Sequence, residues 1–141
     1  MGLFSSAPEI LNDVSVSQIV DLFKEEGYTA ETATTNSGKP YLRFKVEGFT
    51  SCIYFYSEVE GKPGFYKSIQ FAAGFRDKVS IERANQWNVE RRFVKVYSDN
   101  DGELQFDQDI ALDGGVTRKF LAERIKSWRN LFTTVLAFVA K

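Results

Sequence analysis

Two carboxylates in one predicted strand are the first candidates for chemistry. Asp107 and Asp109 lie two residues apart in the segment 104–112, so both side chains point to the same face of the strand. Two neighbouring carboxylates can act as general acid and general base when their surroundings give them different pKa values. Nothing in the neighbouring sequence desolvates one of them selectively, and the alternation with Phe106 and Ile110 favours a charged, solvent-exposed face. A hydrolase that uses Asp107 and Asp109 is kept as an alternative interpretation.

The chain contains no histidine and one cysteine, and this excludes whole classes of site. Ser-His-Asp catalysis and the HExxH zinc site both require histidine, and one cysteine cannot form an internal disulfide. Cys52 has no base beside it in the sequence, which favours a structural thiol. The segment 99–102 lacks calcium ligands at loop positions one and twelve, Tyr97 and Gln108, which favours a hairpin turn. We therefore expect no metal, cofactor, catalytic residue or enzyme activity.

The helix predicted over residues 81–91 carries an unusual set of polar side chains. On a helical wheel, Ile81 and Ala84 define the core-facing side, and Asn85, Asn88 and Arg92 fall within about 60° of them. Buried amides need hydrogen-bond partners, so these residues either satisfy loops and strand ends or form a polar recognition site. Both interpretations stay open from the sequence.

Composition indicates one soluble domain. The chain has 141 residues, a net charge of −1 and 21 aromatic residues, namely 13 Phe, 6 Tyr and 2 Trp. This content is typical of a folded core and argues against disorder, while the balanced charge argues against a nucleic-acid partner. The most apolar stretch, 131–140, is too short to cross a membrane, so we expect a cytoplasmic protein. Residues 1–14 are predicted to be a flexible segment and residues 15–141 a single domain.

Capping residues and periodic apolar positions predict three helices. The first spans 16–26 behind the capping box of Ser15 and Gln18, and the second spans 81–91 behind Ser80. The third follows Thr117 and runs to Ala140. Its apolar positions cover about 160° of the wheel, more than one sheet needs, so a second surface is expected from the first helix or from another subunit.

Alternating patterns predict six strands, over 28–35, 40–47, 50–59, 65–75, 93–98 and 104–112. The short connections between them favour antiparallel pairing with one face in water. Phe44, Phe55 and Phe71 then belong to the core, while Tyr54 and Tyr56 lie on the other face as candidate anchors for a partner.

Several blocks of sequence, in this order and spacing, resemble the YbjN-type family of bacterial sensory transduction regulators over residues 15–140. The blocks are Tyr54-Phe55-Tyr56, IQFAAGF at 69–75, ANQWNVERRF at 84–93, Val96-Tyr97 and LDGGVT at 112–117. The resemblance implies an α+β domain similar to type III secretion chaperones, in which a curved antiparallel sheet is flanked by helices in the order helix–strands–helix–strands–helix. It also implies frequent dimers and no known catalysis.

These observations predict a non-enzymatic bacterial regulatory or chaperone-like protein. It would bind a protein or peptide partner through a hydrophobic groove or a sheet edge, with a homodimer as a further expectation and with no nucleic acid, membrane or cofactor involved. The candidate binding residues are Asn85, Trp87, Asn88, Arg91, Arg92, Tyr54 and Tyr56. A small-molecule-sensing module is the alternative, with a polar pocket between the helix 81–91 and the sheet.

Overall fold

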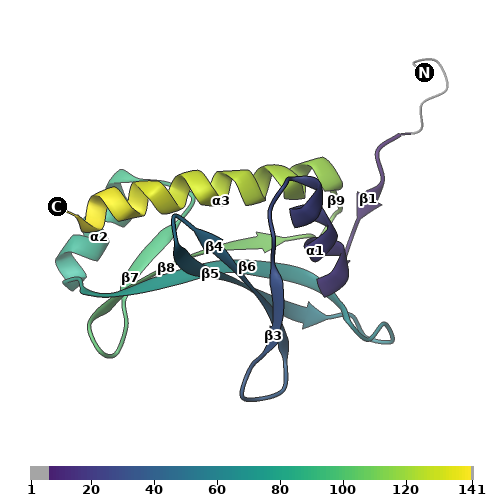
Figure 1. Cartoon of the computed structure of the whole chain (residues 1–141), viewed down its shortest axis with the longest axis horizontal. Coiled ribbons are helices and arrows are strands. Elements are labelled where there is room, and N and C mark those ends of the chain that lie inside the picture. The colour runs from purple at the N-terminus through teal and green to yellow at the C-terminus, as the bar shows by residue number, and fades with distance from the viewer. Residues whose placement is uncertain (1–6, 141) are drawn as a thin grey trace.

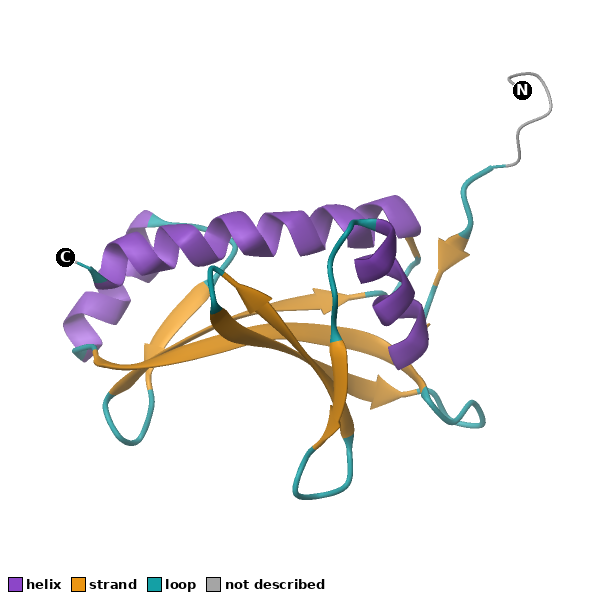
Figure 2. Ribbon diagram, viewed as in Figure 1, coloured by secondary structure: helices purple, strands orange, loops and turns teal. Residues whose placement is uncertain are grey.

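A computed structural model describes residues 7–140 and shows an α+β domain in two layers. Three helices lie on one side of a large antiparallel sheet, with the long helix α3 crossing above the strands (Figures 1 and 2). The helices are α1 (Val16–Glu25), α2 (Ile81–Glu90) and α3 (Arg118–Val139). The predicted α+β class and antiparallel sheet are thereby confirmed.

Seven strands form the main sheet, in the spatial order β3-β4-β5-β6-β8-β7, with β2 paired to one end of β6. A separate two-stranded sheet joins β1 to β9. The strands are β1 (Ile10–Leu11), β2 (Val14–Ser15), β3 (Glu31–Thr34), β4 (Pro40–Val46), β5 (Phe49–Glu58), β6 (Phe65–Lys78), β7 (Lys95–Ser98), β8 (Glu103–Ala111) and β9 (Val116–Thr117).

The N-terminal segment takes a larger part in the fold than the sequence predicted. Residues 1–14 were expected to be flexible, yet β1 pairs with β9, β2 pairs with β6, and both Leu11 and Val14 are buried. Strands of two residues carry no periodic pattern, so these pairings leave no signal in the sequence. Residues 1–6 of the expected flexible segment lie outside the described residues.

All three predicted helix starts are confirmed by capping contacts. The Ser15 hydroxyl accepts from the Gln18 N–H while the Gln18 side chain accepts from the Ser15 N–H, which completes the capping box. Ser80 and Thr117 likewise accept from backbone N–H groups of α2 and α3. Each cap satisfies a donor that would otherwise lack a partner at the helix end.

Helix α3 anchors an aromatic core. The Trp128 ring stacks on Phe71 and Phe106 with centroid distances of 5.5 and 5.3 Å, and its indole N–H donates to the Ser51 hydroxyl at 3.0 Å. Phe132, one turn further along, packs against Phe106 at 5.3 Å. All of these side chains are buried, so α3 and the sheet are held together mainly by apolar burial.

The wide apolar stripe of α3 is explained within one chain. Helix α1 packs beside its N-terminal half, where Arg118 pairs with Glu25 at 2.9 Å. Helix α2 packs beside its C-terminal end, where Arg83 donates to the Phe138 carbonyl at 3.1 Å. Helix α3 thus contacts the sheet and two helices, and its stripe requires no second subunit.

The other face of the sheet carries polar side chains. No helix formed by residues 7–140 lies over it (Figure 2). Cross-strand neighbours run over this open face as a row from Tyr41 through Tyr54 and Gln70 to Asp109. Among the described residues, no helix is both long and apolar enough to span a lipid bilayer.

Candidate functional site

Helix α2 is rotated relative to the prediction. Ile81 was expected to face the core but is 76% exposed, while Trp87, expected on an open face, is 1% exposed. The Trp87 indole N–H donates to the Val94 carbonyl at 3.1 Å, and its ring lies against Phe138 with centroids 5.1 Å apart. Because Ile81 and Trp87 are both apolar, helical periodicity alone could not decide which of them faces inward. Trp87 is therefore a core residue.

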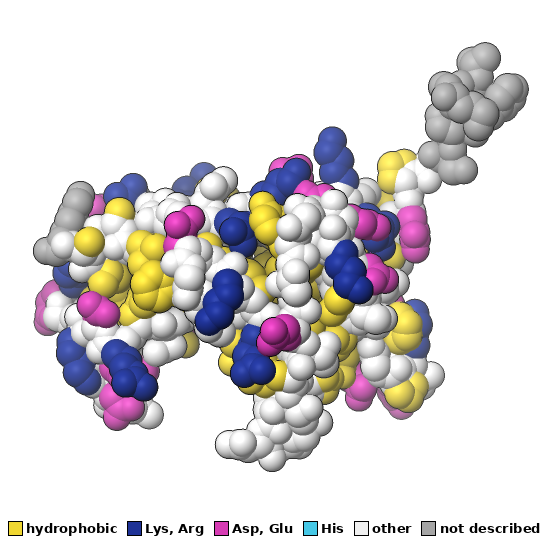
Figure 3. All heavy atoms as spheres, in the orientation of Figure 1, with side chains coloured by type: hydrophobic (Ala, Val, Ile, Leu, Met, Phe, Trp, Pro, Cys, Tyr) yellow, Lys and Arg dark blue, Asp and Glu magenta, His cyan; other side chains and the backbone are white. Residues whose placement is uncertain are grey.

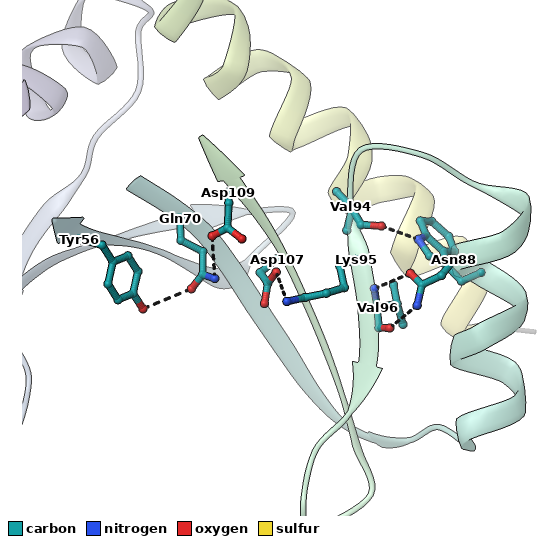
Figure 4. Close-up of polar contacts among 9 residues, drawn as sticks. Tyr56, Gln70, Asn88, Val94, Lys95, Val96, Asp107 and Asp109 are labelled. Atoms are coloured by element: carbon teal, nitrogen blue, oxygen red, sulfur yellow. Dashed lines mark hydrogen bonds and ion pairs between the residues drawn. The ribbon is translucent and has the colours of Figure 1, made fainter. Parts of the chain in front are cut away.

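Asn88 is bound at the edge of the sheet (Figure 4). Its side-chain N–H donates to the Val96 carbonyl at 2.8 Å, and its amide oxygen accepts from the Val96 N–H at 3.0 Å. The side chain thus pairs with outward-facing backbone groups of the edge strand β7, as a neighbouring strand would. Edge strands left open invite pairing with other chains, so Asn88 closes this edge.

The remaining polar candidates of this region do not converge on a pocket. Asn85, Arg91 and Arg92 are all exposed. The Arg91 guanidinium lies 5.5 Å from the Trp87 ring, and that of Arg92 lies 4.9 Å from the Phe93 ring. The amide of Asn88 is already paired with β7, so this side chain is not available to a ligand between the helix and the sheet.

Phe93 is the least ordinary residue of this region, and the sequence did not mark it as a site. Its φ is 78°, in the left-handed region that an aromatic residue rarely adopts, and its side chain is 65% exposed. Val89 on the outer side of α2 is 76% exposed, as is Ile81. Ile81 and Val89 lie near opposite ends of α2, and Phe93 follows the helix; we call these three exposed apolar residues the α2 patch. The available signal was Ile81, an apolar residue that the prediction assigned to the core-facing side of the helix together with Ala84.

The open face of the sheet places the two tyrosine candidates next to each other on β5. Tyr54 stacks on Tyr41 with centroids 5.4 Å apart. Burial and the neighbouring Cys52 raise the pKa of the Tyr54 hydroxyl to about 12. Tyr56 is 48% exposed and donates to Gln70 at 3.5 Å, and the Gln70 amide donates to Asp109 at 3.0 Å (Figure 4).

The two strand carboxylates differ, contrary to the expectation of a uniformly wet face. Asp107 is 5% exposed and its Oδ1 lies 3.4 Å from the Lys95 ammonium, whereas Asp109 is exposed (Figure 4). Burial raises the pKa of the Asp107 carboxyl above its usual value, although the Lys95 charge acts in the opposite direction. The difference arises from the cover that Lys95 and Tyr97 of the neighbouring strand provide, which the sequence of β8 alone does not show.

The acidic turn between β7 and β8 is held by its own backbone. The Asp99 carboxylate accepts from the N–H groups of Asp101 and Glu103 at 2.8 and 2.9 Å. These bonds lower the pKa of Asp99 below its usual value. The hairpin turn predicted for 99–102 is confirmed, with Gly102 at a φ of 79°.

Comparison with known proteins identifies the family. The family model described as "YbjN: Putative bacterial sensory transduction regulator" matches residues 15–140. The chain belongs to the YbjN family. No curated protein matches the chain, and no solved structure matches it. The resemblance found from the sequence blocks is confirmed, and the family supports a regulatory role at a coarse level.

Proposed function

We propose that this YbjN protein is a non-enzymatic cytoplasmic regulator that binds a partner protein through the α2 patch. The observation that carries the proposal is Phe93, a large aromatic ring turned towards solvent on a strained backbone. Residues in sparsely populated φ/ψ regions persist where the surrounding structure holds them, and they are frequent at ligand clamps and switches. Exposed apolar side chains rimmed by polar ones are typical of interaction surfaces.

The residues around the α2 patch favour a partner segment that carries apolar side chains and carboxylates. Arg91 and Arg92 lie directly before Phe93 and are exposed. Arginine and aromatic residues are enriched among the side chains that dominate binding energy at interfaces. Because Asn88 closes the β7 edge, the partner would dock through side chains rather than as an added strand.

This proposal refines two expectations from the sequence. Binding through a groove or edge, by analogy with type III secretion chaperones, is replaced by binding through an exposed helix side. The tyrosines Tyr54 and Tyr56 then take no direct part, since their sheet face lies on the other side from the helices.

Quantitative affinity capture from the native cell tests the proposal, using wild type, Val89→Asp and the control Asn130→Asp. Both substitutions introduce a carboxylate at an exposed helix position. We expect wild type and Asn130→Asp to capture the same partner and Val89→Asp to lose it. The captured partner should also bind the purified wild-type protein directly. Identical partner sets for all three proteins, or no partner above background, would overturn the proposal.

Sedimentation of the same proteins at micromolar concentration distinguishes a foreign partner from a second copy of the chain. We expect a monomer of about 16 kDa for wild type. A wild-type dimer that Val89→Asp converts to monomers would identify the second copy as the occupant of the patch and contradict the proposed heterologous partner.

A further inference from the structure

A second surface, remote from the α2 patch in the fold, carries a pocket lined by basic side chains. The pocket has a volume of about 520 Å³ and lies between the segment after α1, strand β4 and helix α3. Arg43, Lys45 and Arg129 line it, and the one carboxylate among its lining residues is Glu31. Figure 3 shows several basic side chains, with acidic ones among them, on the face of the molecule below α3.

The pocket exists because β3 covers only part of β4. Pairing of the two strands ends at Glu31 opposite Arg43, so the last residues of β4, from Phe44 on, have no partner in β3. The chain leaves α1 through Gly27 at a φ of 83° and reaches β3 only at Glu31. Between Gly27 and Glu31 the chain is not paired with β4, and this leaves a hollow at the edge of the sheet.

Arg129 is held across this hollow by two contacts that leave part of its guanidinium free. Its Nη1 donates to the Lys45 carbonyl at 3.1 Å, and its guanidinium lies 4.2 Å from the centre of the Tyr28 ring. It extends from the middle of α3, whose neighbouring Trp128 is locked in the core. A guanidinium fixed in this way is preorganised, so it loses little freedom when it binds an anion.

The other two cations are available to a ligand. The Lys45 ammonium donates to the Thr50 hydroxyl at 2.8 Å, which positions it and leaves further N–H donors unused. Arg43 is only loosely paired, with its Nη2 3.9 Å from a Glu31 oxygen and both side chains mostly exposed. Exposed ion pairs of this kind contribute little to stability. A ligand anion that displaces the Glu31 carboxylate from Arg43 therefore loses little free energy by breaking the pair.

We infer that this pocket binds a small organic phosphate of about nucleotide size. Two arginines and one lysine among the lining residues supply the positive charge and the N–H donors that phosphate oxygens bind. The volume is typical of small-molecule sites and exceeds what inorganic phosphate would fill. The Glu31 carboxylate at the rim and the Thr29 side chain supply acceptors for ligand hydroxyl groups.

Isothermal titration at low ionic strength tests the inference with ADP, inorganic phosphate and citrate as probes. We expect ADP to bind with a dissociation constant below about 1 mM and more tightly than either other probe. Amide chemical shifts of Gly27, Thr29 and Thr50 should change during the ADP titration. Citrate binding as tight as ADP binding would show a general anion site and overturn the inference, as would no detectable binding of ADP up to about 5 mM.

Matched variants locate the site. Lys45→Gln and Arg129→Gln should each weaken ADP binding about tenfold, the effect of losing one charge-assisted hydrogen bond. Arg76→Gln, an exposed arginine on β6 that does not line the pocket, should bind like wild type. Lys45 is exposed, so its variant tests the site even if Arg129→Gln unfolds.

Unchanged binding by Lys45→Gln would place the ligand elsewhere and overturn the assignment. Val89→Asp in the α2 patch should bind ADP as wild type does. This inference and the proposed partner binding can therefore fail independently.

Discussion

Individual side chains at the end of α2 divide into structural and exposed groups. Asn88 and Trp87 are bound to the β7 segment, at Val96 and Val94 respectively. Asn85 lies one turn before Asn88 on the same helix and is exposed as Asn88 is, but it makes no side-chain hydrogen bond within residues 7–140. The distinction gives a direct test of the structural role of Asn88.

Replacing Asn88 by alanine should lower the free energy of unfolding by about 1–3 kcal/mol, because it leaves the Val96 N–H and carbonyl without their partner. Urea denaturation measures the change. Asn85→Ala is the control and should alter stability by less than about 0.5 kcal/mol. Equal losses for both variants would contradict the edge-closing role of Asn88.

The left-handed backbone conformation of Phe93 should lower the free energy of unfolding of the protein. Phe93→Gly removes the side chain that disfavours a φ of 78°, whereas Phe93→Ala removes the ring but keeps a Cβ in the same backbone region. We expect the glycine variant to be more stable than the alanine variant by about 1 kcal/mol in thermal or urea unfolding. If alanine were the more stable of the two, Phe93 would carry no backbone strain.

Asp107 should make stability depend on pH. Burial raises the pKa of its carboxyl in the folded state, so the folded protein holds the proton to higher pH than the unfolded chain. Its contribution to stability is therefore full below the unfolded value of about 4 and is lost as the pH rises through the folded pKa.

The Asp107→Asn variant should thus have a higher free energy of unfolding than wild type at pH 7, and this advantage should shrink towards pH 4. Urea denaturation at both pH values measures it. Asp109→Asn, at the exposed neighbour, should change stability by less than about 0.5 kcal/mol at either pH. A loss of stability in Asp107→Asn at pH 7 would mean that the attraction to Lys95 outweighs the cost of burial.

At the scale of elements, the long periodic segments could be predicted from sequence and the short ones could not. The capping residues Ser15, Ser80 and Thr117 predicted where the helices begin, because each directly precedes a segment with the apolar periodicity of a helix. The strands β1 and β2 were missed, because their conformation depends on partners far along the chain. The rotation of α2 was also missed, since the packing of Trp87 on Phe138 is a tertiary contact.

Helix α3 should contribute more to stability through Trp128 than through its charged residues. Trp128→Ala should lower the free energy of unfolding by about 3–5 kcal/mol. The Trp128 ring is fully buried and stacks on Phe71 and Phe106, so its removal leaves a cavity in the core. Lys126→Ala, which breaks an exposed contact with Glu26, should cost less than about 1 kcal/mol. Chemical denaturation compares the two, and a similar cost for both would contradict the account of the core.

Across the whole molecule, two candidate binding surfaces lie in different parts of the fold. Helix α2 lies beside the C-terminal end of α3 (Figure 1), whereas the basic pocket is lined by Arg129 from the middle of α3 and by the segment after α1. Helix α3 contributes Arg129 to the pocket and packs against α2 through the contact of Phe138 with the buried Trp87. The candidate residues named from sequence include Arg91 and Arg92 beside the α2 patch but none of the residues that line the pocket, because those come from separate elements.

The affinity of the captured partner for the Phe93→Gly variant tests the central claim most directly. Titration calorimetry with purified proteins compares this variant with wild type, and urea denaturation shows whether the variant is folded. We predict at least about tenfold weaker binding by Phe93→Gly, because the exposed ring is lost from the contact, while the fold stays intact. Unchanged affinity in a folded Phe93→Gly variant would contradict the claim that the α2 patch binds the partner.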